Sequence, residues 1–76
     1  MKHLLMKIVQ SLVDSPDEIQ INEIVGSGSL VLELKVAKLD LGKVIGKQGR
    51  TAQSIRAILN AASAKNKKRV MLEILE

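Results

Sequence analysis

The feature that most constrains this chain is the segment Val44–Arg50, which reads Val-Ile-Gly-Lys-Gln-Gly-Arg. Its two glycines, Gly46 and Gly49, bracket two polar residues. Because glycine has no Cβ, it adopts positive φ angles and lets another backbone approach closely. An alanine-rich stretch typical of a helix follows at once, from Arg50 to about Lys65. Since the first turn of a helix has unpaired N–H groups and a partial positive charge, we expect this loop to contact phosphate.

Positive charge is concentrated around this loop. The chain has a net charge of +4, but the segment from Lys43 to Arg69 contains no Asp or Glu and carries +8, which leaves −4 on the rest. Such asymmetry predicts an anionic partner for the second half of the chain. The alternative interpretation is a solvated helix face with a basic end. The cations of this segment are Lys43, Lys47, Arg50, Arg56, Lys65, Lys67, Lys68 and Arg69.

The first half of the chain predicts a helix followed by a β-hairpin. Apolar residues between His3 and Asp14 recur at helical spacing and form one stripe, and a turn with proline follows. Residues 18–25 alternate at first and slip phase after Ile21, which indicates either a bulge or an edge strand. After a turn at Gly26–Ser29, residues 30–38 alternate regularly. The face expected to be buried consists of Leu30, Leu32, Leu34 and Val36.

The second half predicts two helices and a last strand. Asp40 is expected to cap a short helix over residues 41–45, which Gly46 ends. The long helix that follows the loop leads to a basic turn at residues 66–68 and a strand over residues 69–76. The long helix is expected to bury Ile55, Ile58, Leu59 and Ala62 and to expose Gln53, Arg56, Asn60, Ser63 and Lys67.

The order of these elements, α-β-β-α-α-β, predicts a single domain over residues 1–76. Three strands with three helices over one face make a two-layer α+β fold. The last strand arrives after a helical crossover and is expected to pair in parallel with the second strand, which gives a mixed sheet.

The residues that the chain lacks argue against an enzyme. It has no cysteine, its one histidine (His3) has no acid at an evident spacing, and no cluster of metal ligands stands out. A P-loop needs four residues between its glycines, whereas Gly42 and Gly46 are separated by three. The dinucleotide fingerprint lacks its third glycine at Val31. We therefore expect no catalytic residue, metal, cofactor or small-molecule substrate.

The apolar segments of the chain do not predict a membrane protein. No apolar run reaches the roughly 18 residues that a membrane span needs. No small-residue cleavage site follows the apolar residues near Met1, and only two lysines lie in the first helical pattern. We expect a cytoplasmic protein with no membrane partner.

The loop and its setting resemble the KH domain in its bacterial type II order, and in detail the small, single-domain KhpA family of RNA-binding proteins. A GxxG loop that clamps a few nucleotides of backbone marks the KH module. Here Gly46-Lys47-Gln48-Gly49 follows a Val-Ile pair and precedes a helix, and the order of elements agrees over essentially the whole chain. The segment Leu12-Val13-Asp14-Ser15-Pro16 after the first helix is also similar.

This resemblance implies a groove for about four single-stranded nucleotides. The loop would hold the sugar-phosphate backbone, with charge from Lys47 and Arg50. In type II order the variable loop falls at Lys67 and Lys68 and forms the opposite wall. The apolar floor would consist of Val44, Ile45 and Ile55, and further contacts are expected from Thr51 and Arg56. The family further implies post-transcriptional regulation or RNA chaperoning.

The absence of aromatic residues predicts weak RNA binding, and an edge strand leaves a second interpretation open. The chain has no Phe, Tyr or Trp, so it forgoes base stacking worth roughly 1–3 kcal/mol per base. We therefore expect a second KH-domain protein or a homodimer to add avidity. The alternative is a protein-interaction module that uses the edge strand near Ile19–Val25, with nucleic-acid binding secondary. Single-stranded DNA also stays open, because a backbone clamp alone does not read the 2′-OH.

Overall fold

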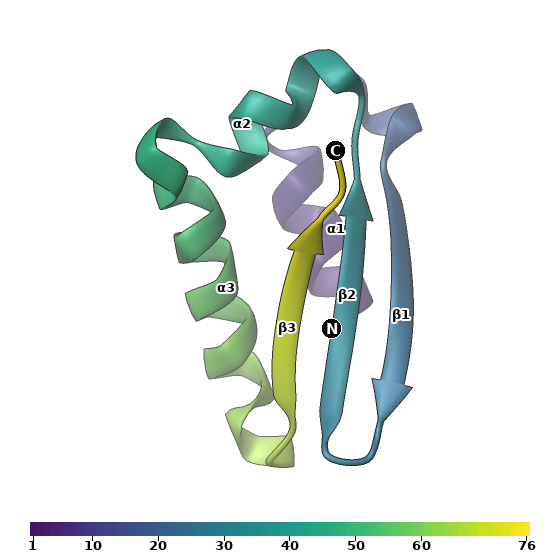
Figure 1. Ribbon diagram of the computed structural model, residues 1–76, viewed down its shortest axis with the longest axis vertical. Helices are drawn as coiled ribbons and strands as arrows, with labels where there is room; N and C mark the ends of the chain where they lie inside the picture. Colours follow the sequence, from purple (N-terminus) through teal and green to yellow (C-terminus); the bar gives the residue numbers. More distant parts are fainter.

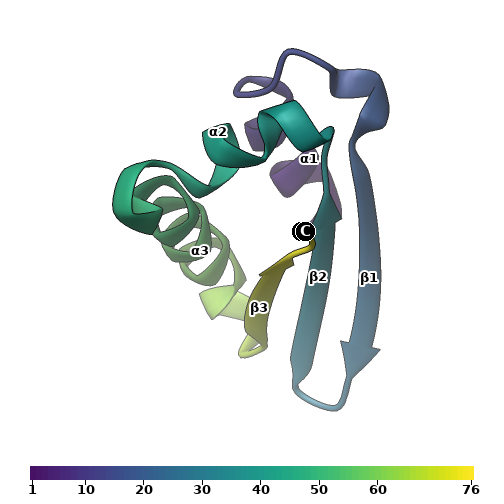
Figure 2. The same ribbon diagram turned by 45° about the horizontal axis from the view of Figure 1, so that its top comes forward.

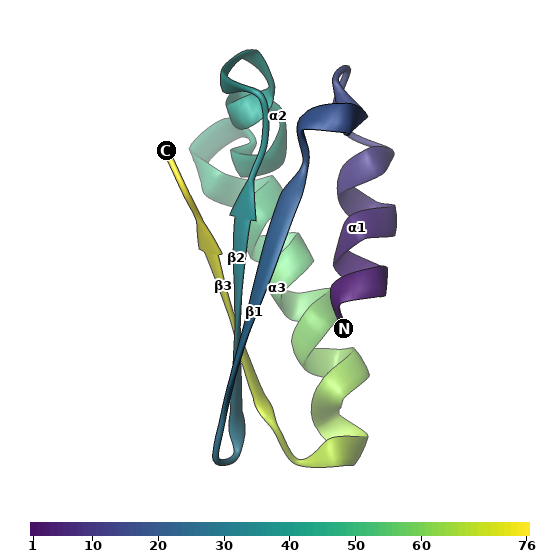
Figure 3. The same ribbon diagram turned by 90° about the vertical axis from the view of Figure 1, so that its right-hand side faces the viewer.

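A three-stranded sheet with three α-helices packed over one of its faces forms the architecture of the chain (Figures 1 and 3). The computed structural model describes all residues, Met1–Glu76. This arrangement confirms the predicted α+β fold with the order α-β-β-α-α-β. Its elements are α1 (Lys2–Gln10), β1 (Gln20–Gly26), β2 (Ser29–Lys35), α2 (Leu41–Ile45), α3 (Arg50–Ser63) and β3 (Arg69–Ile74).

The sheet has the order β1-β2-β3, with an antiparallel hairpin and a parallel last strand. The hairpin closes at the pair Gly26 and Ser29, and Gly28 adopts a φ of 76° in the turn, a conformation that glycine reaches without steric penalty. The register of β1 against β2 runs without interruption from Gln20 to Gly26. Of the two interpretations of the phase slip, the bulge is therefore wrong, and β1 is an edge strand.

The core lies between the inner face of the sheet and helices α1 and α3 (Figure 3). Alternate residues of β2 point into it, and Leu32 and Leu34 are completely buried. Leu5 and Val9 cover them from α1, and Leu59 covers them from α3. The alternation predicted for β2 is confirmed by this burial.

Helix α1 ends at Gln10, four residues before the predicted boundary. The chain tightens there, because the Leu12 amide donates to the Val9 carbonyl at 2.9 Å and the Ser11 hydroxyl donates to Ile8. This turn still places Val13 in the core, with 9% of its surface exposed. The apolar spacing therefore reports correctly which residues are buried, but it does not report where the helix stops.

The buried stripe of α3 differs from the prediction. Ile58 is 46% exposed and Ala62 is exposed, whereas Ser63, predicted to be polar surface, is buried. Ser63 satisfies its hydroxyl by donating to the Asn60 carbonyl at 3.1 Å. Because α1 covers part of the same face of the sheet, α3 meets the core along a narrow line. The residues on that line are Ala52, Ile55, Leu59 and Ser63.

Candidate nucleic-acid interface

The loop between α2 and α3 depends on Gly46 for its shape. Gly46 has a φ of 78° and a ψ of 171°, and its amide donates to the Gly42 carbonyl at 2.8 Å, which ends α2. A Cβ built on Gly46 would lie 2.7 Å from the Thr51 backbone nitrogen and would also collide with the Thr51 side chain. Gly46 thus caps one helix and lets the loop pack directly against the first turn of the next.

The loop continues in two successive left-handed residues. Gln48 has a φ of 57° and Gly49 a φ of 74°, and the Gly49 amide donates to the Gly46 carbonyl at 3.1 Å. Gly49 is the N-cap residue of α3, and no side chain caps this helix. The first-turn N–H groups of α3 therefore lack a side-chain acceptor, which favours an anionic ligand at this end of the helix.

The polar residues of the loop face solvent. Lys47, Gln48 and Arg50 are exposed, while Ile45 and Thr51 are partly buried beside them. The local chain thus presents two cations and a small apolar surface next to an uncapped helix end. This combination fits the phosphates and the bases of a nucleic-acid strand.

Two of the residues predicted for the apolar floor lie inside the protein. Val44 has no exposed surface, and Ile55 is 2% exposed. Both belong to the hydrophobic core that joins the helices to the sheet. In this structure they support the loop from beneath and offer no surface to a ligand, so the prediction that they line a groove is corrected, and Ile45 alone of the three is accessible.

The remaining predicted site residues lie progressively farther from the loop. Arg56, near the middle of α3, is exposed and donates from Nη2 to the Leu72 carbonyl of β3 at 3.2 Å. Lys67 and Lys68 are exposed in the turn that joins α3 to β3, at the opposite end of α3 from the loop (Figure 1). Since α3 has 14 residues, these two ends are about 20 Å apart.

Asp40 occupies the predicted N-cap position of α2, but its side chain makes no capping hydrogen bond to the helix. Its side chain is 3% exposed and turns away from the helix, where Oδ1 accepts the Asp14 amide at 3.2 Å and Oδ2 accepts the Ser15 amide at 3.0 Å. Burial by itself would raise the pKa of Asp40, but these two hydrogen bonds and the Lys43 ammonium outweigh it and leave the pKa below its ordinary value.

Lys43 is the one cation of the basic segment whose charge is compensated. Its ammonium pairs with Asp14 and lies 3.3 Å from Asp40 Oδ1. The bond to Asp14 is the main reason that the pKa of Lys43 is raised. The seven other cations between Lys43 and Arg69 make no ion pair with a carboxylate. Their charge is therefore available to a ligand.

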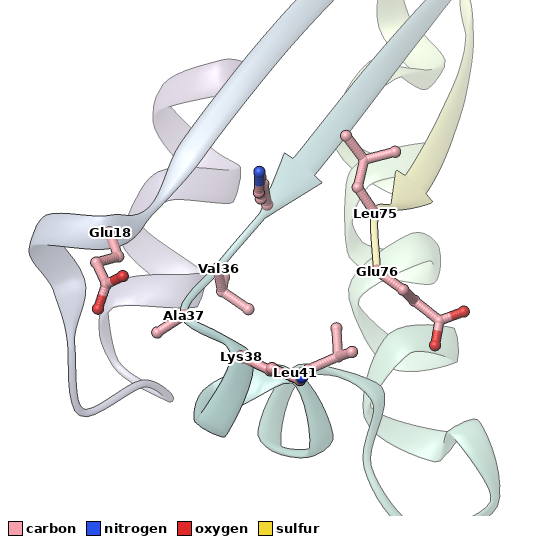
Figure 4. A pocket seen from close by; sticks show the side chains of 8 residues that line it. Glu18, Val36, Ala37, Lys38, Leu41, Leu75 and Glu76 are labelled. Carbon is pink, nitrogen blue, oxygen red and sulfur yellow. The ribbon is translucent and has the colours of Figure 1, made fainter.

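The largest pocket of the molecule lies away from the GxxG loop (Figure 4). It has a volume of about 490 Å³ and lies where β2 leads into α2, beside the C-terminus. Two lysines and two glutamates balance its charge, and none of the predicted site residues lines it. Its lining consists of Glu18, Lys35, Val36, Ala37, Lys38, Leu41, Leu75 and Glu76.

No group of three or more His, Cys, Asp or Glu side chains is arranged to hold a metal ion. No helix is both long enough and apolar enough to cross a membrane.

The hydrogen bonds of Asp40 with Asp14 and Ser15 were not predicted from the sequence. Asp14 and Ser15 precede Asp40 by 26 and 25 residues, and no local pattern connects them. An acidic residue directly before a short helix matches the pattern of an N-cap, which points to the wrong partner. The only available hint is that Asp14 and Ser15 precede a proline, where amides outside regular structure need acceptors.

Comparisons with known proteins agree with this architecture. A family model described as KhpA/KhpB, KH domain, matches residues 2–74. The RNA-binding protein KhpA of Clostridium acetobutylicum is 57% identical over 75 residues, which cover 99% of this chain and all of the relative. The RNA-binding protein KhpA of Borreliella burgdorferi is 51% identical over 96% of this chain and 89% of the relative. No solved structure matches the chain.

Proposed function

Because the chain belongs to the KhpA/KhpB family of KH domains, we propose that it binds single-stranded RNA through the loop Gly46–Gly49. The chain is not an enzyme, since its family consists of RNA-binding proteins. The loop holds about four nucleotides by their sugar-phosphate backbone, as GxxG loops do. The cellular role that fits such binding is post-transcriptional regulation or RNA chaperoning.

One observation carries this proposal: exposed, unpaired cations surround a helix end that no side chain caps. Lys47 and Arg50 flank the left-handed residues of the loop, and neither makes an ion pair. Thr51 and Ile45 lie beside them, partly exposed, where a sugar or base contacts the protein. Each phosphate that these cations neutralise releases counterions, which makes binding weaker as salt rises.

Binding by one copy of the domain is weak, because no aromatic side chain stacks on the bases. A second KH-domain protein, or a second copy of this chain, supplies the missing affinity by holding the same RNA at two places. A protein contact through β1 is the second candidate function. It is favoured by Ile24 and Val25, which are 48% and 66% exposed on an edge strand.

The experiment that tests RNA binding is fluorescence anisotropy with a short labelled single-stranded RNA across a salt series. The wild type is compared with the double variant Lys47→Asp, Gln48→Asp, which reverses the charge of the loop. Both side chains are exposed, so the fold is expected to survive, which circular dichroism checks. We expect this variant to lose binding.

A matched control carries the same two substitutions elsewhere. Gln20 and Lys35 face each other across β1 and β2, are both exposed and lie outside the proposed site. The double variant Gln20→Asp, Lys35→Asp changes the net charge by the same amount and is expected to retain most of the affinity. Equal binding by the loop variant and the wild type would contradict the proposal, and a DNA strand of the same sequence tests discrimination by the 2′-OH.

A further inference from the structure

We propose that Asp40 is a positioning residue for the GxxG loop: its carboxylate ties the connection between α1 and β1 to the start of α2 and thereby holds the loop at the other end of α2 in its binding geometry. The consequence for RNA rests on the proposed function. Asp40 itself touches no RNA in this role and acts through α2.

The side chain of Asp40 is buried, and both of its carboxylate oxygens accept hydrogen bonds. It is the only charged residue in the buried set, and its two carboxylate oxygens each accept one backbone amide, from Asp14 at 3.2 Å and from Ser15 at 3.0 Å. Figure 2 shows the connection between α1 and β1 passing beside the segment that leads into α2. The side chain therefore joins two parts of the chain that are 25 residues or more apart in sequence.

Helix α2 needs such support because it is short. It has five residues, too few for a helix to be stable by its own hydrogen bonds. Val44 is its one fully buried side chain. A single buried side chain does not stop the helix from rotating about it, so other contacts must fix the orientation of α2. At its far end Gly46 packs against Thr51, and at its near end the Asp40 contacts complete the restraint.

The chemistry of the contact requires a carboxylate. Each oxygen of Asp40 accepts an N–H group, and the nearby Lys43 ammonium offsets the negative charge that burial would otherwise disfavour. An asparagine at this position has one oxygen to accept and an NH2 group that would face the second amide as a donor. One backbone N–H would lose its partner, and Lys43 would lose a counter-charge.

The decisive variant is Asp40→Asn, which keeps the size of the side chain. We expect its dissociation constant for the short RNA to rise about tenfold, because one charge-assisted bond is lost and one partly buried amide is left unpaired. The matched control is Leu30→Val, a core change at the hairpin end of β2, far from the loop. It lowers stability while the protein stays folded, so its RNA affinity is expected to equal that of the wild type.

Amide hydrogen exchange provides a readout that does not depend on RNA. In Asp40→Asn, the amides of Asp14, Ser15, α2 and the GxxG loop are expected to exchange faster than in the wild type, while those of the sheet keep their protection. Unchanged protection of α2 and the loop would overturn the positioning role. Unchanged RNA affinity in a folded Asp40→Asn protein would do the same.

These outcomes separate the two proposals. If the loop variant Lys47→Asp, Gln48→Asp binds RNA as well as the wild type, RNA binding at this loop is wrong, and the exchange data alone decide whether Asp40 positions the loop. If Asp40→Asn does not fold, an acid titration of the wild type followed by NMR replaces it. The amide signals of Gly46 and Gly49 are then expected to shift as Asp40 takes up a proton, before the protein unfolds, and their failure to respond would contradict the proposal.

Discussion

At the scale of single residues, neighbours in the sequence have different functions in the fold. Lys43 and Lys47 are four residues apart in the sequence, but the ammonium of Lys43 is paired with two carboxylates and Lys47 has no partner. Gly46 and Gly49 both have positive φ angles, but only Gly46 is pressed against another residue. The functional value of each residue therefore depends on what faces it.

The contrast between the two lysines predicts different salt dependences. Lys47→Ala is expected to weaken RNA binding and to reduce the slope of log K against log salt by about 0.7, the contribution of one phosphate on a single strand. Lys43→Ala is expected to leave that slope unchanged, because its charge is already compensated inside the protein. Anisotropy at several salt concentrations measures both slopes. An equal decrease of the slope in the two variants would show that Lys43 also contacts phosphate.

Gly46 gives a second prediction at this scale. Gly46→Ala is expected to abolish RNA binding and to destabilise the protein by about 1–3 kcal/mol, since a Cβ collides with Thr51 at a positive φ. Gly49→Ala serves as the comparison, because its Cβ meets no atom within 4 Å and only the φ of 74° is unfavourable. Urea unfolding of both variants measures the difference, and an equal loss of stability would indicate that the close approach at Gly46 is not important.

The buried carboxylate of Asp40 predicts a pH dependence. Its pKa is lower in the folded protein than in the unfolded chain, so the unfolded chain takes up the proton first as pH falls. The stabilisation is therefore complete above the ordinary pKa of aspartate and is lost as pH falls through the lower, folded pKa. Lys43 and Asp14 face this carboxylate, and Lys43 keeps its charge throughout this range. Urea unfolding at a series of acidic pH values is expected to show this loss in the wild type and a smaller one in Asp40→Asn.

At the scale of elements, α3 illustrates how packing selects one stripe of a helix. Its sequence offers two adjacent apolar lines, and the sheet accepts the line through Ile55 and Leu59 while Ile58 stays 46% exposed. The narrow contact arises because α1 covers part of the same sheet face. The exposed side of α3 is rich in alanine. It also includes Arg56, which donates a hydrogen bond to the Leu72 carbonyl of β3.

This selection predicts very different effects on stability for two neighbouring substitutions. Leu59→Ala is expected to destabilise the domain by about 2–5 kcal/mol, because it opens a cavity at a completely buried position. Ile58→Ala is expected to change stability by less than about 1 kcal/mol. Chemical denaturation measures both, and a large effect at Ile58 alone would mean that the other stripe faces the core.

At the scale of the whole molecule, the two predicted walls of the RNA site lie at opposite ends of α3. The GxxG loop is at one end and Lys67 and Lys68 are at the other, about 20 Å away along a molecule whose longest dimension is 34 Å. Unpaired cations mark both ends, and Arg56 lies between them. A strand that follows α3 from end to end would contact both groups.

The separation predicts that the effect of the distal lysines depends on RNA length. The double variant Lys67→Ala, Lys68→Ala is expected to weaken binding of a strand long enough to span α3 and to leave binding of a strand of about four nucleotides unchanged. Anisotropy with the two RNA lengths tests this, and the loop variant, which is expected to fail with both, is the control. A loss with the short strand as well would place it nearer to Lys67 and Lys68 than the loop geometry suggests.

Features that depend on neighbouring residues could be predicted from the amino-acid sequence. Alternation of leucines predicted β2 and its buried face, the glycines at 26 and 28 predicted the hairpin, and Gly46 predicted the end of α2, because strand pleat, turn geometry and positive φ are local properties. The order of these elements was enough to predict the layers and the parallel pairing of β3.

The fold, in contrast, sets which residues face one another across long stretches of chain. It assigned Asp40 to the amides of Asp14 and Ser15, compensated the charge of Lys43, and buried Val44 and Ile55 beneath the loop that they had been predicted to line. A periodic pattern reports that a residue is apolar or charged, but the identity of its partner depends on how α1, α2 and α3 share one face of a small sheet. For that reason the position of the GxxG loop between two helices was predictable, whereas the residues that hold the loop in place were not.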